Sequence, residues 1–307
     1  MILGLDIGGT KTAVVLGTPR AEIRWRKQFA TAPERGFEKV FEELSATIGE
    51  ARSNAHEPIE AISVSIGGPL DILKGVIMSP PNLPGWNNIP LKDLLTKKSP
   101  FPVFIEHDGN AGALAEFYFG AGRGFRNIVF LTMGTGLGAG LILDGKVYRG
   151  TTDTAGELGH IRIAEDGPLC YGKSGSFEGY ASGTGIAKLA RMMFPEKWND
   201  TSAITDVYKA FKNGSPEARQ VFERAGTYIG RGFAIIADLL NPERIILGGI
   251  GGRIGDAFLP TAEEVFRQEA LAESASACAI VTAQLGEAIG DVASLCAALD
   301  QGGLAQR

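Results

Sequence analysis

The chain has 307 residues, of which 44% are hydrophobic and 21% charged, so it can fold as one large globular domain or two moderate ones. Its net charge is −5 without long runs of one sign, which excludes the basic surface that nucleic acid or an anionic membrane would select. No apolar stretch approaches the roughly 18 residues that span a bilayer, and the three cysteines are too few for a disulfide framework. These features predict a cytoplasmic protein that binds neither nucleic acid nor a membrane.

The first part of the chain alternates strands with helices. It opens with two strands joined by the turn Gly8-Gly9-Thr10-Lys11, which reads as a hairpin. Apolar residues at helical spacing then predict an amphipathic helix that packs on the sheet. The elements expected here are strands at 2–7, 12–16, 22–29, 59–66 and 102–106, and helices at 37–48 and 111–119.

A similar pattern begins again at residue 127. A strand, the turn Gly134-Thr135-Gly136-Leu137-Gly138 and a returning strand repeat the opening hairpin, which indicates an internal duplication. The elements expected here are strands at 127–133, 139–143, 147–148, 244–247 and 279–285, and helices at 217–240 and 291–299. The pattern predicts a mixed-sheet α/β protein with two lobes and a ligand cleft between them. We expect an N-terminal lobe at 1–110, completed by the C-terminal helix at 290–307, and a C-terminal lobe at 111–289.

Both glycine turns are candidates for phosphate binding. Turn amides can form a nest for phosphate oxygens, and Asp6, just before the first turn, could hold a hydrated Mg²⁺. The alternative is an ordinary hairpin in which glycine only supplies positive φ. The second turn is not a GxGxxG dinucleotide fingerprint, because Ala139 stands where that pattern needs glycine. Two such turns in one chain favour nucleotide binding more strongly than either alone.

Five motifs occur in an order typical of a known family: DIGGTK, SPPNLPGW, HDGNAGALAE, TMGTGLGAG and GELGH. From residue 1 to about residue 299 the chain resembles the ROK family of sugar kinases and sugar-responsive regulators. The resemblance implies an actin-like ATPase (ribonuclease H-like) fold, the use of ATP and Mg²⁺, and phosphorylation of a hexose or an amino-sugar derivative. It also implies a homodimer, and it implies that Gly248 and Gly249 lie against the adenosine. A simple strand-to-loop turn is the alternative for these two glycines.

Asp108 follows a strand and precedes a helix, whose N-terminus favours a carboxylate. The resemblance implies that it is the general base that receives the proton of the attacking sugar hydroxyl. Most of the rate would come from positioning and from charge neutralisation at the γ-phosphate. An N-cap is the structural alternative, and one residue can fill both roles. The family usually has Asn before this Asp; here His107 either contacts the sugar or turns away into the core.

Further polar residues match family positions that contact sugar hydroxyls. Amides and carboxylates suit this task, because a site built on such hydrogen bonds rejects sugars that lack the right hydroxyl. The alternative for Asn82 is a turn residue among prolines, and for Glu178 a solvated loop carboxylate. The sugar-binding residues implied by the resemblance are Gly68, Asn82, His107, Asn110, Glu157, His160 and Glu178.

The resemblance also raises the question of a structural zinc site. Many relatives hold zinc with one His and with three Cys in a CxCGxxGC motif. The His corresponds to His160, but the three thiol positions are occupied by Leu169, Tyr171 and Ser176. We therefore expect no zinc. Tyr171 and Phe177 are expected to hold this loop by packing, which would leave His160 able to touch the sugar.

The motif SPPNLPGW and the trio Glu157, His160 and Glu178 look like those of glucokinase-type members, so we expect ATP-dependent phosphorylation of a hexose, with glucose favoured. N-acyl-hexosamines, fructose and mannose stay open as acceptors, and polyphosphate as a donor. The expected partners are thus a sugar and a nucleotide. Regulators of the family usually carry a helix-turn-helix ahead of the DIGGTK-like hairpin, which here begins at residue 2. We therefore expect no DNA-binding regulator, and the alternative is a sugar sensor that does not bind DNA.

Overall fold

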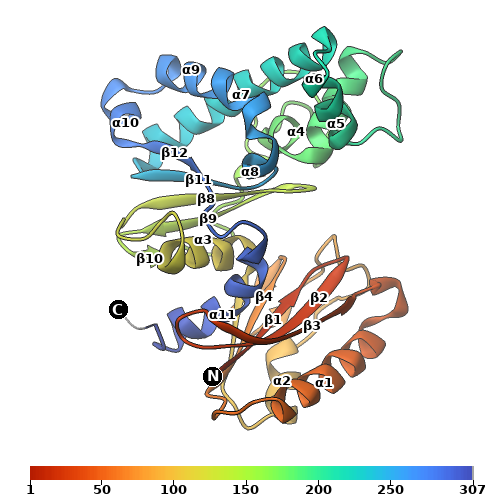
Figure 1. Ribbon diagram of the computed structural model, residues 1–307, viewed down its shortest axis with the longest axis vertical. Coiled ribbons are helices and arrows are strands. Elements are labelled where there is room, and N and C mark those ends of the chain that lie inside the picture. The colour runs from red at the N-terminus through yellow and green to blue at the C-terminus, as the bar shows by residue number, and fades with distance from the viewer. Residues whose placement is uncertain (306–307) are drawn as a thin grey trace. The chain divides into compact units, whose positions relative to one another are not determined.

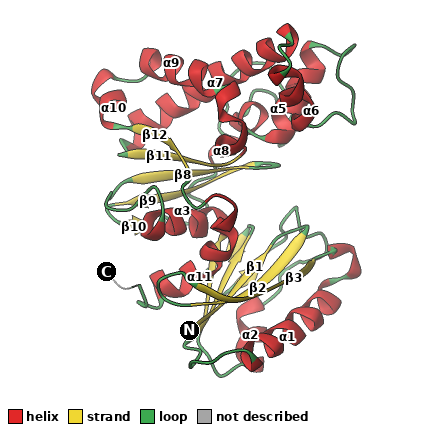
Figure 2. Ribbon diagram, viewed as in Figure 1, coloured by secondary structure: helices red, strands yellow, loops and turns green. Residues whose placement is uncertain are grey.

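The computed structural model describes residues 1–305, which form two compact α/β units (Figures 1 and 2). Unit 1 contains Met1–Phe119, Arg149–Ala155 and the chain from Glu287 onward, and unit 2 contains Gly120–Tyr148 and Gly156–Gly286. The boundary expected at residue 110 falls inside helix α3 (Asp108–Phe119). That helix packs against α11 (Ile289–Gln301) and therefore belongs to unit 1.

The sheet of unit 1 has the strand order β3-β2-β1-β4-β7. Strands β1, β2 and β3 are antiparallel neighbours, while β4 and β7 continue the sheet in parallel with β1. The strands are β1 (Ile2–Ile7), β2 (Lys11–Gly17), β3 (Ile23–Ala30), β4 (Ala61–Ile66) and β7 (Val103–His107), and a short ribbon adds β5 (Leu70–Asp71) and β6 (Val76–Ile77). All five predicted strands of this sheet are confirmed, with ends shifted by one or two residues.

Each face of this sheet is covered by helices. The apolar side chains of Leu3, Leu5 and Ile7 enter a core with α1 (Phe37–Ser53) and α2 (Leu91–Lys98). The alternate residue Gly4 lies against α11, where an added Cβ would come within 2.3 Å of Ser294 Oγ. The period of two thus divides β1 between two packing layers, and glycine permits the close approach of α11.

The sheet of unit 2 has the order β10-β9-β8-β11-β12, with the same strand directions as the sheet of unit 1. Its strands are β8 (Ile128–Met133), β9 (Leu137–Leu143), β10 (Lys146–Val147), β11 (Arg244–Gly249) and β12 (Ala279–Thr282). Two sheets with one topology support the internal duplication predicted from the glycine turns.

Helices cover this second sheet, and α7 (Pro216–Leu240) is the longest of those described. Gly226 and Gly230 of α7 face α9 (Leu259–Glu269) and the residue before it; added Cβ atoms would lie 2.7 Å from Phe258 O and 2.4 Å from Ala262 O. These glycines let the two helices approach closely. The other helices are α4 (Phe177–Ala181), α5 (Gly183–Met193), α6 (Ile204–Lys212), α8 (Ile250–Ile254) and α10 (Ala272–Ala277). Within the described residues, no helix has both the length and the apolar character to cross a bilayer.

Candidate active site

The first glycine turn is fixed by hydrogen bonds on both sides. Gly8 N donates to Lys11 O at 3.0 Å, and Thr31 Oγ1 donates to Gly8 O at 2.6 Å. Gly9 packs on the backbone of Asn82, because a Cβ at position 9 would lie 2.4 Å from Asn82 O. Thr10 and Lys11 stay exposed. A rigid turn with exposed polar groups is the arrangement that the phosphate-nest hypothesis requires.

Asp108 and Asn82 converge on the backbone at Gly67. A Cβ added to Gly67 would lie 3.1 Å from Asn82 Nδ2 and 3.5 Å from Asp108 Oδ2. Asp108 opens α3, accepts a 2.8 Å hydrogen bond from Gly109 N, and leaves 51% of its side chain exposed. The carboxylate is thus held by a helix N-terminus and accessible to a ligand, which a buried N-cap would not be.

His107 lies beside the Asp108 carboxylate. Its Nδ1 accepts a hydrogen bond from Gly109 N at 3.2 Å and is 3.2 Å from Asp108 Oδ1. The opposite edge of the ring covers Gly68, where an added Cβ would approach His107 Nε2 to 2.7 Å. Of the two alternatives for His107, this arrangement disfavours a histidine turned into the core.

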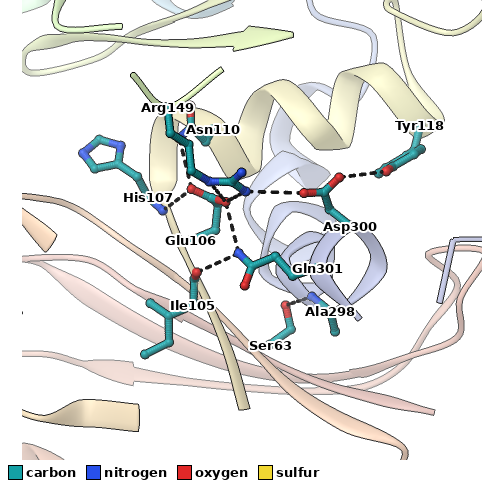
Figure 3. Close-up of polar contacts among 10 residues, drawn as sticks. All are labelled: Ser63, Ile105, Glu106, His107, Asn110, Tyr118, Arg149, Ala298, Asp300 and Gln301. Carbon is teal, nitrogen blue, oxygen red and sulfur yellow. Dashed lines mark hydrogen bonds and ion pairs between the residues drawn. The ribbon is translucent and has the colours of Figure 1, made fainter. Parts of the chain in front are cut away.

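Asn110, in contrast, is buried, with 3% of its surface exposed. Its Nδ2 donates to Glu106 Oε1 at 3.0 Å, and its Oδ1 is a buried atom with no hydrogen-bond partner among the described residues. The side chain faces Glu106 (Figure 3). Direct contact of Asn110 with a sugar would therefore require its oxygen to become accessible.

Glu106 is a functional candidate that no motif in the sequence indicated. Its carboxylate is fully buried and pairs with Arg149, whose Nε donates at 3.1 Å and whose Nη2 also contacts Oε2. Gln301 of α11 donates to the same oxygen at 3.2 Å. His107 N donates to Oε1 at 3.1 Å, so Glu106 is bonded to residues on both sides of Asp108.

The network around Glu106 extends through unit 1 (Figure 3). Asp300 lies 3.4 Å from Arg149 Nη2 and accepts a hydrogen bond from Tyr118 of α3 at 3.3 Å. Gln301 also donates to Ile105 O at 2.9 Å. One ionic cluster therefore joins a short returning segment, a strand end and two helices behind Asp108, and its carboxylate at Glu106 is fully buried.

Asp6 is a second acidic group close to Asp108. Burial, followed by the charge of Asp108, raises the pKa of Asp6 to about 7, although Lys11 opposes this shift. A bound cation stabilises the ionised form of a buried carboxyl group that lies beside another carboxylate. Carboxylate oxygens are also ligands that suit Mg²⁺. Asp6 is thus chemically suited to the predicted magnesium site.

The second glycine turn lies in unit 2 and is joined to Glu178. Gly134 N donates to Gly136 O at 2.9 Å, and Leu137 N donates to Glu178 Oε2 at 2.9 Å. A Cβ on Gly136 would lie 2.7 Å from the same oxygen. The end of β11 also reaches this turn, because Gly249 has φ +60° and an added Cβ would lie 2.1 Å from Met133 O. The Glu178 carboxylate is therefore hydrogen-bonded to this turn and is not a solvated loop carboxylate.

His160 and Glu157 are the other two predicted sugar-binding residues of unit 2. His160 Nε2 lies 4.0 Å from Glu157 Oε2, and about half of each side chain is exposed. The ring of Tyr171 stacks on the His160 ring with a centroid distance of 3.5 Å, and Tyr171 Oη donates to Glu178 Oε2 at 2.5 Å. Burial and this hydrogen bond raise the pKa of Tyr171, so the hydroxyl keeps its proton.

The zinc set of the family does not fit the residues around His160. The thiol positions carry Leu169, Tyr171 and Ser176, which supply no thiolate or imidazole. The neighbouring Cys170 is buried, and burial raises the pKa of its thiol, which disfavours the thiolate that binds zinc. Phe177 packs into α7, where a Cβ on Gly232 would lie 2.3 Å from its ring.

The predicted residues thus fall into two groups, each brought together within one unit. Unit 1 holds Asp6, the first glycine turn, Gly68, Asn82, His107, Asp108 and Asn110. Unit 2 holds the second glycine turn, Glu157, His160, Glu178, Gly248 and Gly249.

Comparison with known proteins agrees with these features. A glucokinase from Halalkalibacterium halodurans is 31% identical over 94% of this chain and 92% of its own length. The structure of a ROK family glucokinase from Streptomyces griseus in complex with glucose and AMPPNP is 32% identical, with a TM-score of 0.78, and covers 98% of this chain and 99% of that one. A ROK family transcriptional regulator, a homologue of the Escherichia coli MLC protein, is 25% identical with a TM-score of 0.87 and covers 99% of this chain and 79% of that one.

The match to the family itself covers nearly the whole chain. The model of the ROK family matches residues 2–298, from β1 into α11. Together with the solved structures, this match confirms the predicted actin-like ATPase fold. The chain belongs to the ROK family.

Proposed function

We propose that this ATP-dependent sugar kinase phosphorylates a hexose, with glucose preferred and Asp108 as the general base. The observation that carries the proposal is the half-exposed Asp108 carboxylate at the N-terminus of α3, beside Asn82 and the first glycine turn. The glucokinases among the relatives support glucose as the acceptor.

The residues of unit 1 suit the activation of a hydroxyl. Asp108 accepts the proton of the attacking hydroxyl, and Asn82 and His107 offer polar atoms that can hold the neighbouring hydroxyls. Glu157, His160 and Glu178 of unit 2 offer carboxylate and imidazole groups for the remaining hydroxyls. A sugar that lacks one of these hydroxyls leaves a polar group unpaired, and this loss is the basis of selectivity.

The two glycine turns suit a nucleoside triphosphate. Their backbone amides can bind phosphate oxygens, and Lys11 adds a positive charge at the first turn. Mg²⁺, when bound with the nucleotide, neutralises phosphate charge, and Asp6 would hold it through water. Positioning of the hydroxyl by Asp108 and of the phosphates by the turns then accounts for most of the catalysis.

An ADP-release assay over a panel of hexoses tests the proposal. The panel contains glucose, mannose, fructose, N-acetylglucosamine and N-acetylmannosamine, with ATP as donor. For polyphosphate as donor the sugar phosphate is measured instead, because that transfer forms no ADP. We expect glucose to give the highest kcat/KM, and Asp108→Asn to lower kcat by about 10³-fold or more because the base is lost. The control is Asp93→Asn. Asp93 is an exposed residue of α2, and its sequence position is far from both glycine turns, so this variant should keep full activity.

A sugar sensor without kinase activity is the second candidate, and the similarity to a ROK transcriptional regulator favours it. In that case calorimetry would detect glucose binding, but no sugar would stimulate ADP release above the Asp108→Asn background. That result would refute the kinase proposal.

A further inference from the structure

Tyr171 contacts two of the residues that we assign to sugar binding. Its ring stacks on His160 with an interplanar angle of 24°, and its hydroxyl donates to Glu178. The hydroxyl packs over Gly159, where an added Cβ would lie 3.3 Å from it. One side chain thus connects the segment around His160 to α4 and to the second glycine turn.

The backbone at Tyr171 is unfavourable for a tyrosine. Cys170 and Lys173 exchange two 3.0 Å hydrogen bonds, so Tyr171 and Gly172 form the two-residue turn of a small hairpin. Both have positive φ, +53° and +70°, a conformation in which Asn-Gly is preferred and a bulky residue is rare. A tyrosine kept at such a position indicates that its side chain makes contacts worth more than the strain.

The loop also lacks the ligands for the metal that could orient His160 in relatives. Within residues 1–305, no group of three His, Cys, Asp or Glu side chains is arranged to hold a metal ion. The position of Tyr171 is itself one of the three thiol positions of the zinc motif. The tyrosine therefore stands where a ligand would stand, and it contacts the same histidine.

We propose that Tyr171 is a positioning residue that takes the place of the zinc: it orients the His160 ring by stacking and the Glu178 carboxylate by hydrogen bonding. This inference rests on the proposed function, because His160 and Glu178 are assigned to the sugar. Lys173 supports the arrangement by donating from Nζ to His160 O. His160 and Glu178 are thus held by an aromatic side chain and need no metal.

Two variants separate the two contacts. Tyr171→Phe keeps the ring and removes the hydrogen bond, and we expect about a 10-fold higher KM for glucose. Tyr171→Leu removes both contacts, and we expect a further increase of about 5-fold. The KM for ATP should stay within about 2-fold of wild type, because the variants weaken the binding of the sugar and not the binding of the nucleotide. Tyr148→Phe, at another tyrosine of unit 2 that is half exposed, is the matched control.

Two measurements do not depend on activity. With three histidines in the chain, the His160 ring protons can be assigned by NMR; they should shift upfield, keep that shift in Tyr171→Phe and lose it in Tyr171→Leu. Metal analysis of protein purified without chelators should find less than about 0.1 zinc per chain, against about one for a filled structural site.

The proposal is overturned if Tyr171→Phe and Tyr148→Phe have the same KM for glucose, if the His160 shift is unchanged in Tyr171→Leu, or if the wild type carries one equivalent of zinc. A wild type that releases no ADP with any hexose would refute the proposed function instead. The NMR and metal measurements would then still decide the role of Tyr171 in orienting His160.

Discussion

Removal of the Arg149 charge should destabilise unit 1 strongly. In Arg149→Met the Glu106 carboxylate stays fully buried and keeps only hydrogen bonds from neutral groups, among them Asn110 and Gln301. Removing one partner of a buried ion pair costs about 3–5 kcal/mol, and because a quarter of the Arg149 side chain is exposed we expect about 3 kcal/mol. For a domain of this size, each kcal/mol lowers Tm by about 2–4 °C.

Urea unfolding followed by tryptophan fluorescence measures this loss. Two of the three tryptophans, Trp25 and Trp86, lie in unit 1, so the signal reports mainly on the unit that contains the pair. The control is Lys27→Met, which breaks an exposed ion pair with Glu50 and should cost less than about 1 kcal/mol.

A double variant tests the cause. Glu106→Gln combined with Arg149→Met removes both charges, so it should be more stable than Arg149→Met alone. The explanation is refuted if Arg149→Met lowers the free energy of unfolding no more than Lys27→Met does, or if the double variant is the least stable of the set. In either case the unpaired charge of Glu106 is not the cause of the lost stability.

Two further predictions concern the residues expected to bind the nucleotide and its magnesium ion. The pKa of Asp6, about 7, lies above its ordinary value of 3.8, so the folded state binds more protons than the unfolded state between these pH values. Without Mg²⁺, the free energy of unfolding of the wild type relative to Asp6→Asn should therefore fall as pH rises from 4 to 7, and a difference that is constant with pH would contradict this assignment. At Gly249, alanine would place Cβ 2.1 Å from Met133 O in a backbone with φ +60°, so Gly249→Ala should raise the KM for ATP about 10-fold or more. Gly252→Ala, whose Cβ would have its nearest neighbour at 4.0 Å, should leave this KM unchanged, and equal values for the two variants would refute the argument.

The sequence predicted those parts of the fold that have strong local signals. Both hairpins, the parallel strands that follow them and the long helix α7 have regular apolar spacing and glycine turns, and all are confirmed. The short helices α2, α4, α5, α6, α8, α9 and α10 were not predicted. Most span fewer than three turns, so their amphipathic period is too short to detect, and their stability comes from tertiary packing.

The residues of the candidate site could be predicted where they lie in a continuous sequence motif. They could not be predicted where contacts join residues that are far apart in the sequence. Asp108 and the glycine turns lie in continuous motifs, whereas Glu106 pairs with Arg149 and Gln301, which are 43 and 195 positions away. The signal that could have revealed Glu106 is a charged residue at the end of an otherwise apolar strand, since a buried carboxylate requires a partner. The partners themselves depend on the return of Arg149 to unit 1 and on the packing of α11, which no local pattern specifies.

The place of α11 in unit 1 has a consequence for synthesis on the ribosome. Unit 2 has all its strands once residue 286 has been made, whereas the β1–β4 face of unit 1 waits for α11, the last helix described. Until Leu295 and its neighbours emerge, that face lacks its cover, and the nascent chain exposes apolar surface of the kind that chaperones bind. Unit 1 therefore begins to be translated before unit 2 and is completed after it.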